Sequence, residues 1–258
     1  MEPFAALPEQ PEAKRLLAAA LREGPAHAYL LHGPAGTGKR AAALAFAGAI
    51  LGDERRATEG THPDLYVLEA LGEMIRIDAV RELRRDLHMR PFEAERRVYL
   101  ILSAHLLNED AADALLKDLE EPPPYAVIVL VANELGPLPP TIRSRCQLVP
   151  FRRLSERTVR AWVEEHAPGL SAHEATALAR VAAGRLDRAR RLLEPESVEA
   201  RGRLLEVARG PYAEAGFEPS EAACLVRKAS RVSRPPRSSA LRSTSSCTRK
   251  VATNLPGL

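Results

Sequence analysis

An apolar run, a glycine-rich loop and a stretch of strong helix formers follow one another near the start of this chain. The run AHAYLLH (26–32) leads directly into Gly33–Lys39, which reads G-x-x-x-x-G-K, the spacing of a phosphate-binding loop. Residues 40–51, RAAALAFAGAIL, favour helix. A strand, this loop and a helix, in that order, form the context in which such a loop binds phosphate. The order predicts the first unit of an α/β nucleotide-binding fold.

Further apolar runs continue this alternation along the chain. DLYVLEA begins at Asp64, RVYLILSA at Arg97 and YAVIVLVA at Tyr125. The helical stretches AVRELRRDLHM (79–89) and NEDAADALLKDLEE (108–121) separate them. Because the runs are continuously apolar rather than alternating, we expect strands covered on both faces, and hence a parallel sheet flanked by helices. A nucleotide would then lie at the carboxyl ends of the strands.

The strand signals end near Phe151, and helical stretches follow. These are LSERTVRAWVEEHA, SAHEATALARVAA, RLDRARRLLE and SVEARGRLLEVAR. We predict an α/β domain over residues 1–151 and a small all-helical domain over 152–210. From about Glu221, within the final segment 211–258, apolar periodicity is lost, and we expect disorder there.

Local signals also mark individual helices and their ends. PEAKRLLAAALRE (11–23) reads as an amphipathic helix. Asn108, Ser155 and Ser171 stand where N-caps are expected, and Pro122–Pro124 should end the helix that Asn108 begins.

Composition argues against secretion and membrane insertion. The three cysteines, Cys146, Cys224 and Cys247, lack metal-ligand or disulfide spacing, which indicates a reducing cytosol. The first residues, MEPFAALPEQ, show no charged segment followed by an apolar run, so we expect no secretory signal. No stretch approaches the roughly 18 apolar residues of a membrane span. We therefore expect a cytoplasmic protein without a membrane partner.

The net charge of +3 is unevenly distributed. From Arg227 onward there are eight Lys/Arg and no Asp/Glu, which leaves −5 for the preceding residues. Such a body is not a strong nucleic-acid binder. The tail itself could be a polybasic DNA-binding arm. Near Phe217–Ala222 an Ala/Leu/Glu-rich sequence changes abruptly to one rich in Ser, Arg and Pro. The tail could therefore instead be the product of a shifted reading frame.

Five blocks in a fixed order resemble one known family. The blocks are HAYLLHGPAGTGK, THPDLYVL, IDAVRELRRDL, LLNEDAADALLKDLEEPPP and LPPTIRSRCQLVPF. Between about Leu7 and Leu193 the chain resembles the delta-prime subunits of the bacterial DNA polymerase III clamp loader. The sequence HPD at His62–Asp64 favours delta-prime over the ATP-hydrolysing gamma/tau subunits.

The resemblance implies a fold and a set of partners. The fold would be an AAA+ P-loop domain, a helical lid and a carboxy-terminal helical collar. The partners would be gamma/tau and delta subunits in a five-subunit ring, the sliding clamp, and primer-template DNA reached through the complex. The chain would then be a subunit of a nucleotidyltransferase holoenzyme and not catalytic alone.

Two departures from the family bear on these expectations. Family members commonly carry a four-cysteine zinc module after the P-loop helix, but the segment LGDERRATEGT (51–61) has no cysteine, so we expect no zinc. The collar is largely missing from the sequence, which leaves 211–258 as its truncated remnant and basic tail.

The glycine-rich loop is the candidate nucleotide site. Backbone N–H groups and a helix N-terminus bind phosphate oxygens there, and lysine adds a cation. Arg40 stands where a Ser or Thr hydroxyl would bind magnesium, and arginine is only a donor. ATP or ADP bound without turnover, Arg40 neutralising phosphate charge, and an empty relic loop all stay open. The candidate residues are Gly33, Pro34, Ala35, Gly36, Thr37, Gly38, Lys39 and Arg40.

The residues that would drive hydrolysis are also absent. The resemblance implies two neighbouring carboxylates before the LNEDAA helix, one assisting magnesium and one activating water. Leu102 and Ser103 occupy those positions. We therefore identify no magnesium ligand and no metal site, and we expect no hydrolysis in cis.

Three further positions match family features. The resemblance implies that Arg145, in the sequence SRC, enters a neighbour's ATP site as an arginine finger, which is worth about 10³–10⁵ in rate. It could instead be a surface arginine that closes a strand. Asn133 and Arg188 match sensors of nucleotide, although Asn133 could be a strand-end cap and Arg188 a solvated arginine.

These expectations give one leading function and two alternatives. The leading function is a non-hydrolysing delta-prime-like subunit that helps to load the sliding clamp and donates Arg145 in trans. The first alternative is a self-sufficient AAA+ ATPase of the gamma/tau kind, which would need carboxylates at Leu102 and Ser103. The second is a product that cannot join a ring because its collar is missing.

Overall fold

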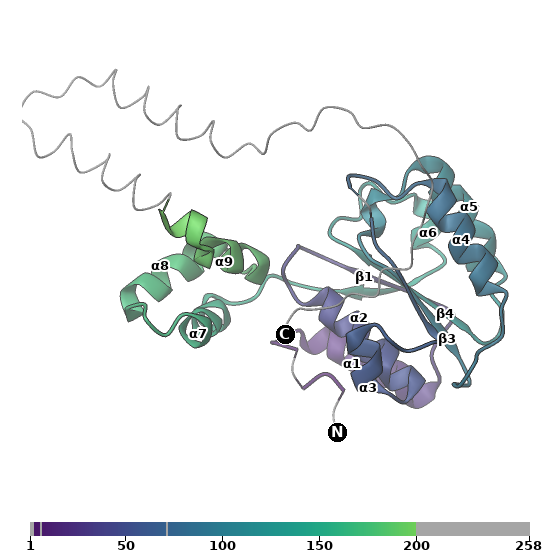
Figure 1. Ribbon diagram of the computed structural model, residues 1–258, viewed down its shortest axis with the longest axis horizontal. Helices are drawn as coiled ribbons and strands as arrows, with labels where there is room; N and C mark the ends of the chain where they lie inside the picture. The colour runs from purple at the N-terminus through teal and green to yellow at the C-terminus, as the bar shows by residue number, and fades with distance from the viewer. Residues whose placement is uncertain (1–2, 6, 71, 200–258) are drawn as a thin grey trace, which may run out of the picture. The chain divides into compact units, whose positions relative to one another are not determined.

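A computed structural model describes residues 3–5, 7–70 and 72–199 (Figure 1). Within them, five strands form one parallel sheet in the order β2-β3-β4-β1-β5. The strands are β1 (Ala28–His32), β2 (Leu65–Leu68), β3 (Arg97–Ile101), β4 (Ala126–Ala132) and β5 (Gln147–Pro150). The central strand β1 pairs on both sides, since Leu30 lies opposite Leu130 of β4 and Leu148 of β5. The predicted parallel sheet is confirmed.

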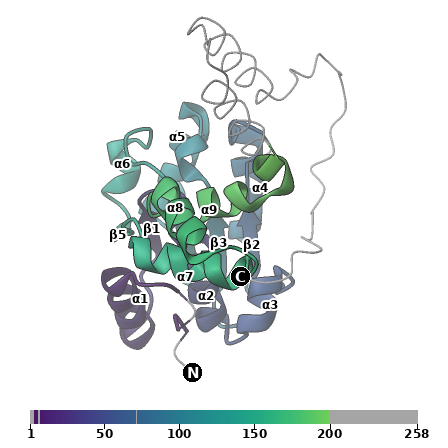
Figure 2. The ribbon, with the colours of Figure 1, turned by 90° about the vertical axis from the view of Figure 1, so that its left-hand side faces the viewer.

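Helices cover both faces of this sheet. One face carries α1 (Pro11–Glu23), α2 (Lys39–Leu51) and α3 (Glu54–Glu59). The other carries α4 (Ile77–Leu87), α5 (Glu109–Glu120) and the short α6 (Pro140–Arg143). Both views show these two layers (Figures 1 and 2).

The two-sided covering explains the continuously apolar strands. All seven residues of β4 are buried. Val129 packs in the core beneath α1 and α2, whereas its neighbour Ile128 packs in the core beneath α4 and α5. Successive side chains point to opposite faces of a strand, so both must be apolar where both faces are covered.

Three helices follow the sheet. They are α7 (Glu156–His166), α8 (Ala172–Ala182) and α9 (Leu186–Leu193). The described residues divide into two compact units between Asp187 and Arg188, inside α9. The predicted boundaries at 152 and 211 stay predictions, and the predicted tail, 211–258, lies outside the described residues.

Most helix ends agree with their sequence signals. The amphipathic helix 11–23 is confirmed as α1. The side chains of Asn108, Ser155 and Ser171 each accept a backbone N–H at the start of α5, α7 and α8, and Ser171 forms a full capping box with Glu174. The short helices were not predicted: α3, α6 and the 3₁₀ turn η1 (Ala104–Leu106). Along the part of the chain that the structure describes, each helix is too short or too polar to cross a bilayer.

Asp64, the last residue of the HPD sequence, holds the segment that leads into β3. Its buried carboxylate accepts the N–H groups of Phe92, Glu93 and Ala94 at 2.7–2.9 Å. Burial pushes the pKa of Asp64 up, but these three bonds and the charge of Arg97 outweigh it and leave the pKa below its ordinary value. The aspartate of HPD is therefore a structural anchor.

Arg97 completes this buried cluster. Its side chain is buried, its Nη2 lies 2.7 Å from Oδ1 of Asp86, and its Nε lies 3.9 Å from Oδ1 of Asp64. The rings of Phe92 and Tyr99 lie 5.3 and 5.8 Å from its guanidinium carbon. Its Nε and Nη1 have no hydrogen-bond partner among the described residues. The guanidinium therefore depends on its two carboxylates for stability.

We expect Asp64→Ala to lower the free energy of unfolding by about 2–4 kcal/mol, because it leaves three N–H groups and part of a buried cation without a partner. Urea denaturation measures this. The stabilisation should be present above about pH 4 and be lost as the pH falls through the folded-state pKa. Asp78→Ala removes an exposed pair with Arg81 and should change stability by about 0.5 kcal/mol or less; equal losses in the two variants would contradict the anchor.

Candidate functional site

The glycine-rich loop joins β1 to α2 at the carboxyl ends of the strands, as predicted. Gly33, Gly36 and Gly38 have φ of 138°, 68° and 93°, a region that favours glycine. Gly38 is the N-cap of α2, and Lys39 begins the helix. The loop therefore has the local backbone that its sequence predicts.

Neighbouring segments of the same chain pack closely against this loop. A Cβ on Gly33 would lie 2.1 Å from the carbonyl oxygen of Phe151, and one on Gly36 would lie 1.9 Å from Oδ1 of Asp187. The N–H of Leu186 also donates to the carbonyl of Gly36 at 2.9 Å. The carboxylate of Asp187, which also pairs with Arg185 at 2.7 Å, thus lies directly beside Gly36 of the loop.

Lys39 is bound within its own loop. Its side chain is only 4% exposed, and its Nζ donates to the carbonyls of Gly33 at 2.7 Å and Pro34 at 2.5 Å. Burial lowers the pKa of Lys39 to about 8; the charge of Asp187 raises it and that of Arg185 lowers it further. The hydroxyl of Thr37 donates to the same Pro34 carbonyl at 2.9 Å. The loop's own carbonyls therefore hold the ammonium.

The positions that would hold magnesium do not fit a metal ion. Arg40 forms an ion pair with Glu69 beyond the end of β2, with Nη1 and Oε1 2.7 Å apart. Leu102 is 3% exposed and belongs to the apolar core. Ser103 has φ of 60° and precedes η1. A cation, a buried alkyl group and a neutral hydroxyl are poor partners for a divalent ion. Among the residues whose placement is described, no group of three or more His, Cys, Asp or Glu could hold a metal.

Two residues that the sequence analysis did not single out connect the amino-terminal segment to the start of α7, and one of them also contacts the loop. Gln10 donates from Nε2 to the carbonyl of Arg152 at 2.7 Å and to that of Thr37 at 3.5 Å, and its Oε1 accepts the N–H of Arg152 at 3.0 Å. Glu9 accepts the N–H of Ser155, the N-cap of α7, at 3.1 Å. Burial raises the pKa of Glu9, but hydrogen bonds from Ser155 and Thr158 outweigh this and lower it.

The backbone of these two residues is strained. Glu9 and Gln10 have φ of 53° and 54°, which non-glycine residues rarely adopt. The strain is retained because the side chains bind groups far away in the sequence. No local pattern near residue 10 could have predicted contacts with residues more than 140 positions away.

Arg145 lies in the turn that connects the end of α6 to the start of β5. Its Nη1 donates to the carbonyl of Thr141 at 2.9 Å, and its Nη2 pairs with Oε1 of Glu120 at the end of α5. The side chain is 32% exposed. The guanidinium is therefore held at the surface and stays accessible to solvent.

The two predicted sensors lie in different units. Asn133, directly after β4, donates its N–H to Nδ1 of His105 at 3.3 Å, which ties the strand end to η1. Burial lowers the pKa of His105, the charge of Glu134 raises it and that of Lys39 lowers it, with a net decrease. Arg188 is exposed on α9 and belongs to the second unit. Both sensor roles stay predictions.

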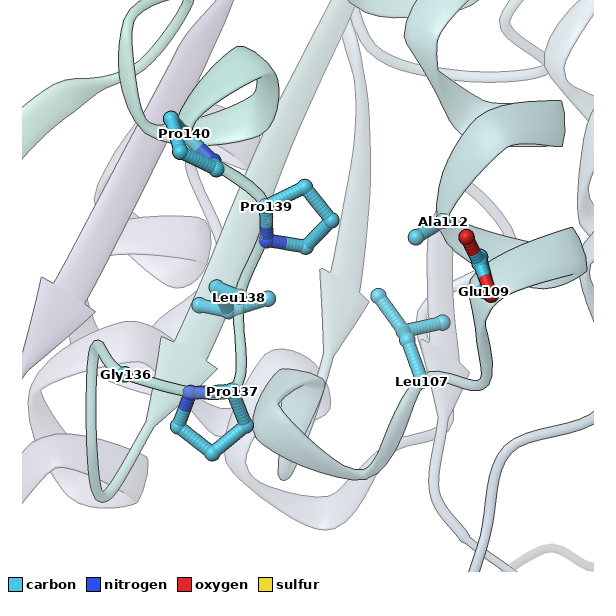
Figure 3. Close-up of a pocket in the computed structure, with 8 residues that line it drawn as sticks. All are labelled: Leu107, Glu109, Ala112, Gly136, Pro137, Leu138, Pro139 and Pro140. Atoms are coloured by element: carbon cyan, nitrogen blue, oxygen red, sulfur yellow. The ribbon is translucent and has the colours of Figure 1, made fainter.

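A hollow of about 340 Å³ lies between the start of α5 and the loop before α6. Pro139 on the loop and Leu107 and Ala112 on the α5 side face it from opposite sides (Figure 3). Glu109 is the one ionisable residue of its lining. The lining does not bring together the groups that acid–base catalysis needs.

A family model described as "DNA polymerase III, delta subunit" matches residues 9–155, more than half of the chain. The chain belongs to this family. Its curated relatives agree and point to the delta-prime type of clamp-loader subunit.

Two of these relatives are delta-prime subunits. The chain is 41% identical over 136 residues to DNA polymerase III subunit delta' of Pseudomonas aeruginosa, covering 47% of this chain and 42% of the relative. It is 32% identical over 163 residues to that of Bacillus subtilis, covering 58% and 50%. It is also 33% identical over 159 residues to the Bacillus subtilis tau subunit, covering 57% and 28%. The chain thus spans half or less of the length of these relatives.

Solved structures share the predicted fold, a parallel sheet flanked by helices. A DNA polymerase III gamma subunit-related protein of Thermotoga maritima matches with a TM-score of 0.53 and 24% identity, over 86% of this chain and 78% of that one. RuvB of the same organism, a Holliday junction branch migration motor, matches with a TM-score of 0.54 and 19% identity, over 90% and 72%. The predicted fold class is therefore confirmed.

The buried ammonium of Lys39 predicts an unusual dependence of stability on pH. Its pKa is about 8 in the folded chain and near 10.5 ordinarily, so between these values the unfolded chain binds the extra proton. The free energy of unfolding should then rise with pH across this window, by at most about 1.4 kcal/mol per pH unit. Lys39→Met should remove the rise in urea denaturation series, whereas Lys117→Met, at an exposed position on α5, should keep it. Equal slopes in both variants would show that Lys39 is not buried as an ammonium.

Proposed function

We propose that this chain is a non-hydrolysing, delta-prime-like subunit of the DNA polymerase III clamp loader, and that it supplies Arg145 to the ATP site of a neighbouring subunit. Its membership of the family supports the first part. One observation carries both the lack of hydrolysis and the role of Arg145. Arg40, Leu102 and Ser103 replace the groups that would bind magnesium and activate water, while the family's arginine is present on an accessible turn.

The proposed chemistry of Arg145 follows from the guanidinium group. It is charged at every physiological pH and presents several N–H donors in one plane. Placed beside a transferring phosphoryl group, it would stabilise the negative charge that develops on the oxygens. Arginine fingers accelerate hydrolysis about 10³–10⁵-fold, which corresponds to roughly 4–7 kcal/mol of barrier. Arg145 would thus act on ATP held by the neighbour.

We propose that any ATP or ADP at the chain's own loop is bound without turnover. The glycine backbone and the start of α2 suit phosphate, although the carboxylate of Asp187, paired with Arg185, lies beside Gly36. Arg40 is already paired with Glu69. Bound nucleotide would therefore stabilise the chain rather than drive a cycle of movement.

The proposed partners are the gamma/tau and delta subunits, the sliding clamp, and primer-template DNA reached through the complex, all in the cytoplasm. The complex would load the clamp onto primed DNA during replication. The alternative, a self-sufficient ATPase, is favoured by the 33% identity to a tau subunit. It requires a metal ligand and a base that Leu102 and Ser103 do not provide.

We expect Arg145→Ala to slow ATP hydrolysis at the neighbouring site at least tenfold while the complex stays assembled. The test is single-turnover hydrolysis by a complex reconstituted with gamma/tau and delta subunits of the same organism, clamp and primed DNA, with assembly followed by size-exclusion chromatography. Arg143→Ala, two residues earlier on α6, is the matched control. Unchanged hydrolysis in Arg145→Ala would reject the finger assignment.

We also expect the purified chain to hydrolyse no ATP, with or without primed DNA. Its affinity for a fluorescent ATP analogue should be unaffected by magnesium, because no residue at the loop holds the ion. Phosphate release and equilibrium titration with and without a magnesium chelator measure the two properties. Turnover that requires magnesium, in a preparation free of gamma/tau, would revive the self-sufficient ATPase.

A further inference from the structure

We propose that Glu120 is a positioning residue for Arg145, holding the guanidinium ready to enter the neighbour's ATP site. The proposal rests on the function proposed above for Arg145. Glu120 lies at the end of α5, whereas Arg145 follows α6, so the positioning group comes from a different element.

The ion pair joins two elements that are each firmly held. Glu120 is the last residue of α5, directly after the buried Leu119, and the N–H of Glu121 closes the helix on the carbonyl of Lys117 at 2.9 Å. On the other side, α6 starts with Pro140 and packs through Ile142, which is fully buried. The backbone that carries Glu120 and the turn that carries Arg145 are therefore both held in place.

Three acceptors hold two nitrogens of the guanidinium. Nη1 donates to the carbonyl of Thr141 at 2.9 Å and lies 3.4 Å from Oγ of Ser144, and Nη2 pairs with Glu120. An arginine side chain has five N–H donors. Within the described residues this leaves the Nε–H and one Nη2–H of Arg145 for oxygens of another molecule. The side chain is thus restrained but keeps donors for a phosphate.

This restraint is useful because a free arginine has many rotamers. A side chain held close to its working geometry loses less entropy when it meets its target. The backbone of Arg145 is held as well, since its N–H donates to the carbonyl of Ile142 at 3.2 Å. Of the three acceptors, only Glu120 comes from outside the turn, so only Glu120 fixes the direction of the guanidinium relative to α5.

The carboxylate of Glu120 also bears a negative charge. This charge would oppose the positioning effect if it competed with phosphate for Arg145. If Glu120 mainly competed with the phosphate for the guanidinium, it would keep Arg145 out of the ATP site. Its removal would then accelerate hydrolysis. Glu120 and Arg145 are 48% and 32% exposed, and water screens such charges strongly. The geometric effect should therefore exceed the electrostatic one, and removal should slow hydrolysis.

The test is a double-mutant cycle in the reconstituted complex with gamma/tau, delta, clamp and primed DNA. Glu120→Ala should lower kcat for ATP hydrolysis at the neighbouring site about 3- to 10-fold with KM for ATP unchanged. Glu120→Gln keeps an acceptor oxygen and should stay within about twofold of wild type. In the Arg145→Ala background, Glu120→Ala should have no further effect, because the two residues act as one. Glu121→Ala, at the next exposed position, is the matched control.

The outcomes separate this inference from the function on which it rests. If Arg145→Ala leaves hydrolysis unchanged, the finger assignment itself fails. If Arg145→Ala slows hydrolysis but Glu120→Ala does not, or accelerates it, only the positioning role is overturned. An additive loss in the double variant overturns it too. Size-exclusion chromatography shows in each case that the complex has assembled.

Discussion

Burial of both faces of one parallel sheet is the constraint on which the rest of this molecule depends. The strands β1, β3 and β4 are apolar on both sides, so helices must cover both. Parallel neighbours in turn require crossovers, which bring the carboxyl ends of the strands to one edge. The glycine-rich loop, Ser103 and Asn133 lie at strand ends for this reason. The fold thus places the glycine-rich loop at this edge whatever chemistry its side chains carry.

Several side chains at that edge are engaged in contacts within the chain. Lys39 binds the carbonyls of its own loop, Arg40 binds Glu69, and Leu102 fills the core. Asp187 lies against Gly36, and Gln10 links the loop to the segment before α7. Each of these contacts connects the loop or its neighbours to another part of the same chain. These contacts agree with the proposal that the chain serves a neighbour's site rather than its own.

Local patterns predicted the part of this structure that local forces determine. The helix 11–23, the caps Asn108, Ser155 and Ser171, and the glycine loop all depend on residues within a few positions of one another. The short helices α3 and α6, with six and four residues, lack the length that a periodic pattern needs.

Contacts between residues far apart in the sequence could not be predicted, for a different reason. Arg145 pairs with a residue 25 positions earlier, and Gln10 with one 142 positions later. Only the packing of α5 against α6, and of the first residues against the end of β5, brings these groups together. The family's motifs identified Arg145 itself, but the group that holds it appeared only in three dimensions.

The positive charge of Arg145 is proposed to act in the ATP site of an adjoining subunit. A structure of the assembled complex, trapped with magnesium and a mimic of the transferring phosphoryl group, tests it most directly. The account predicts that Nε or Nη2 of Arg145 lies within about 3 Å of an equatorial oxygen of the mimic in the adjoining subunit, with Glu120 still in contact. Arg145 directed away from that oxygen, or a magnesium-bound mimic held at Lys39 and Arg40 of this chain, would contradict it.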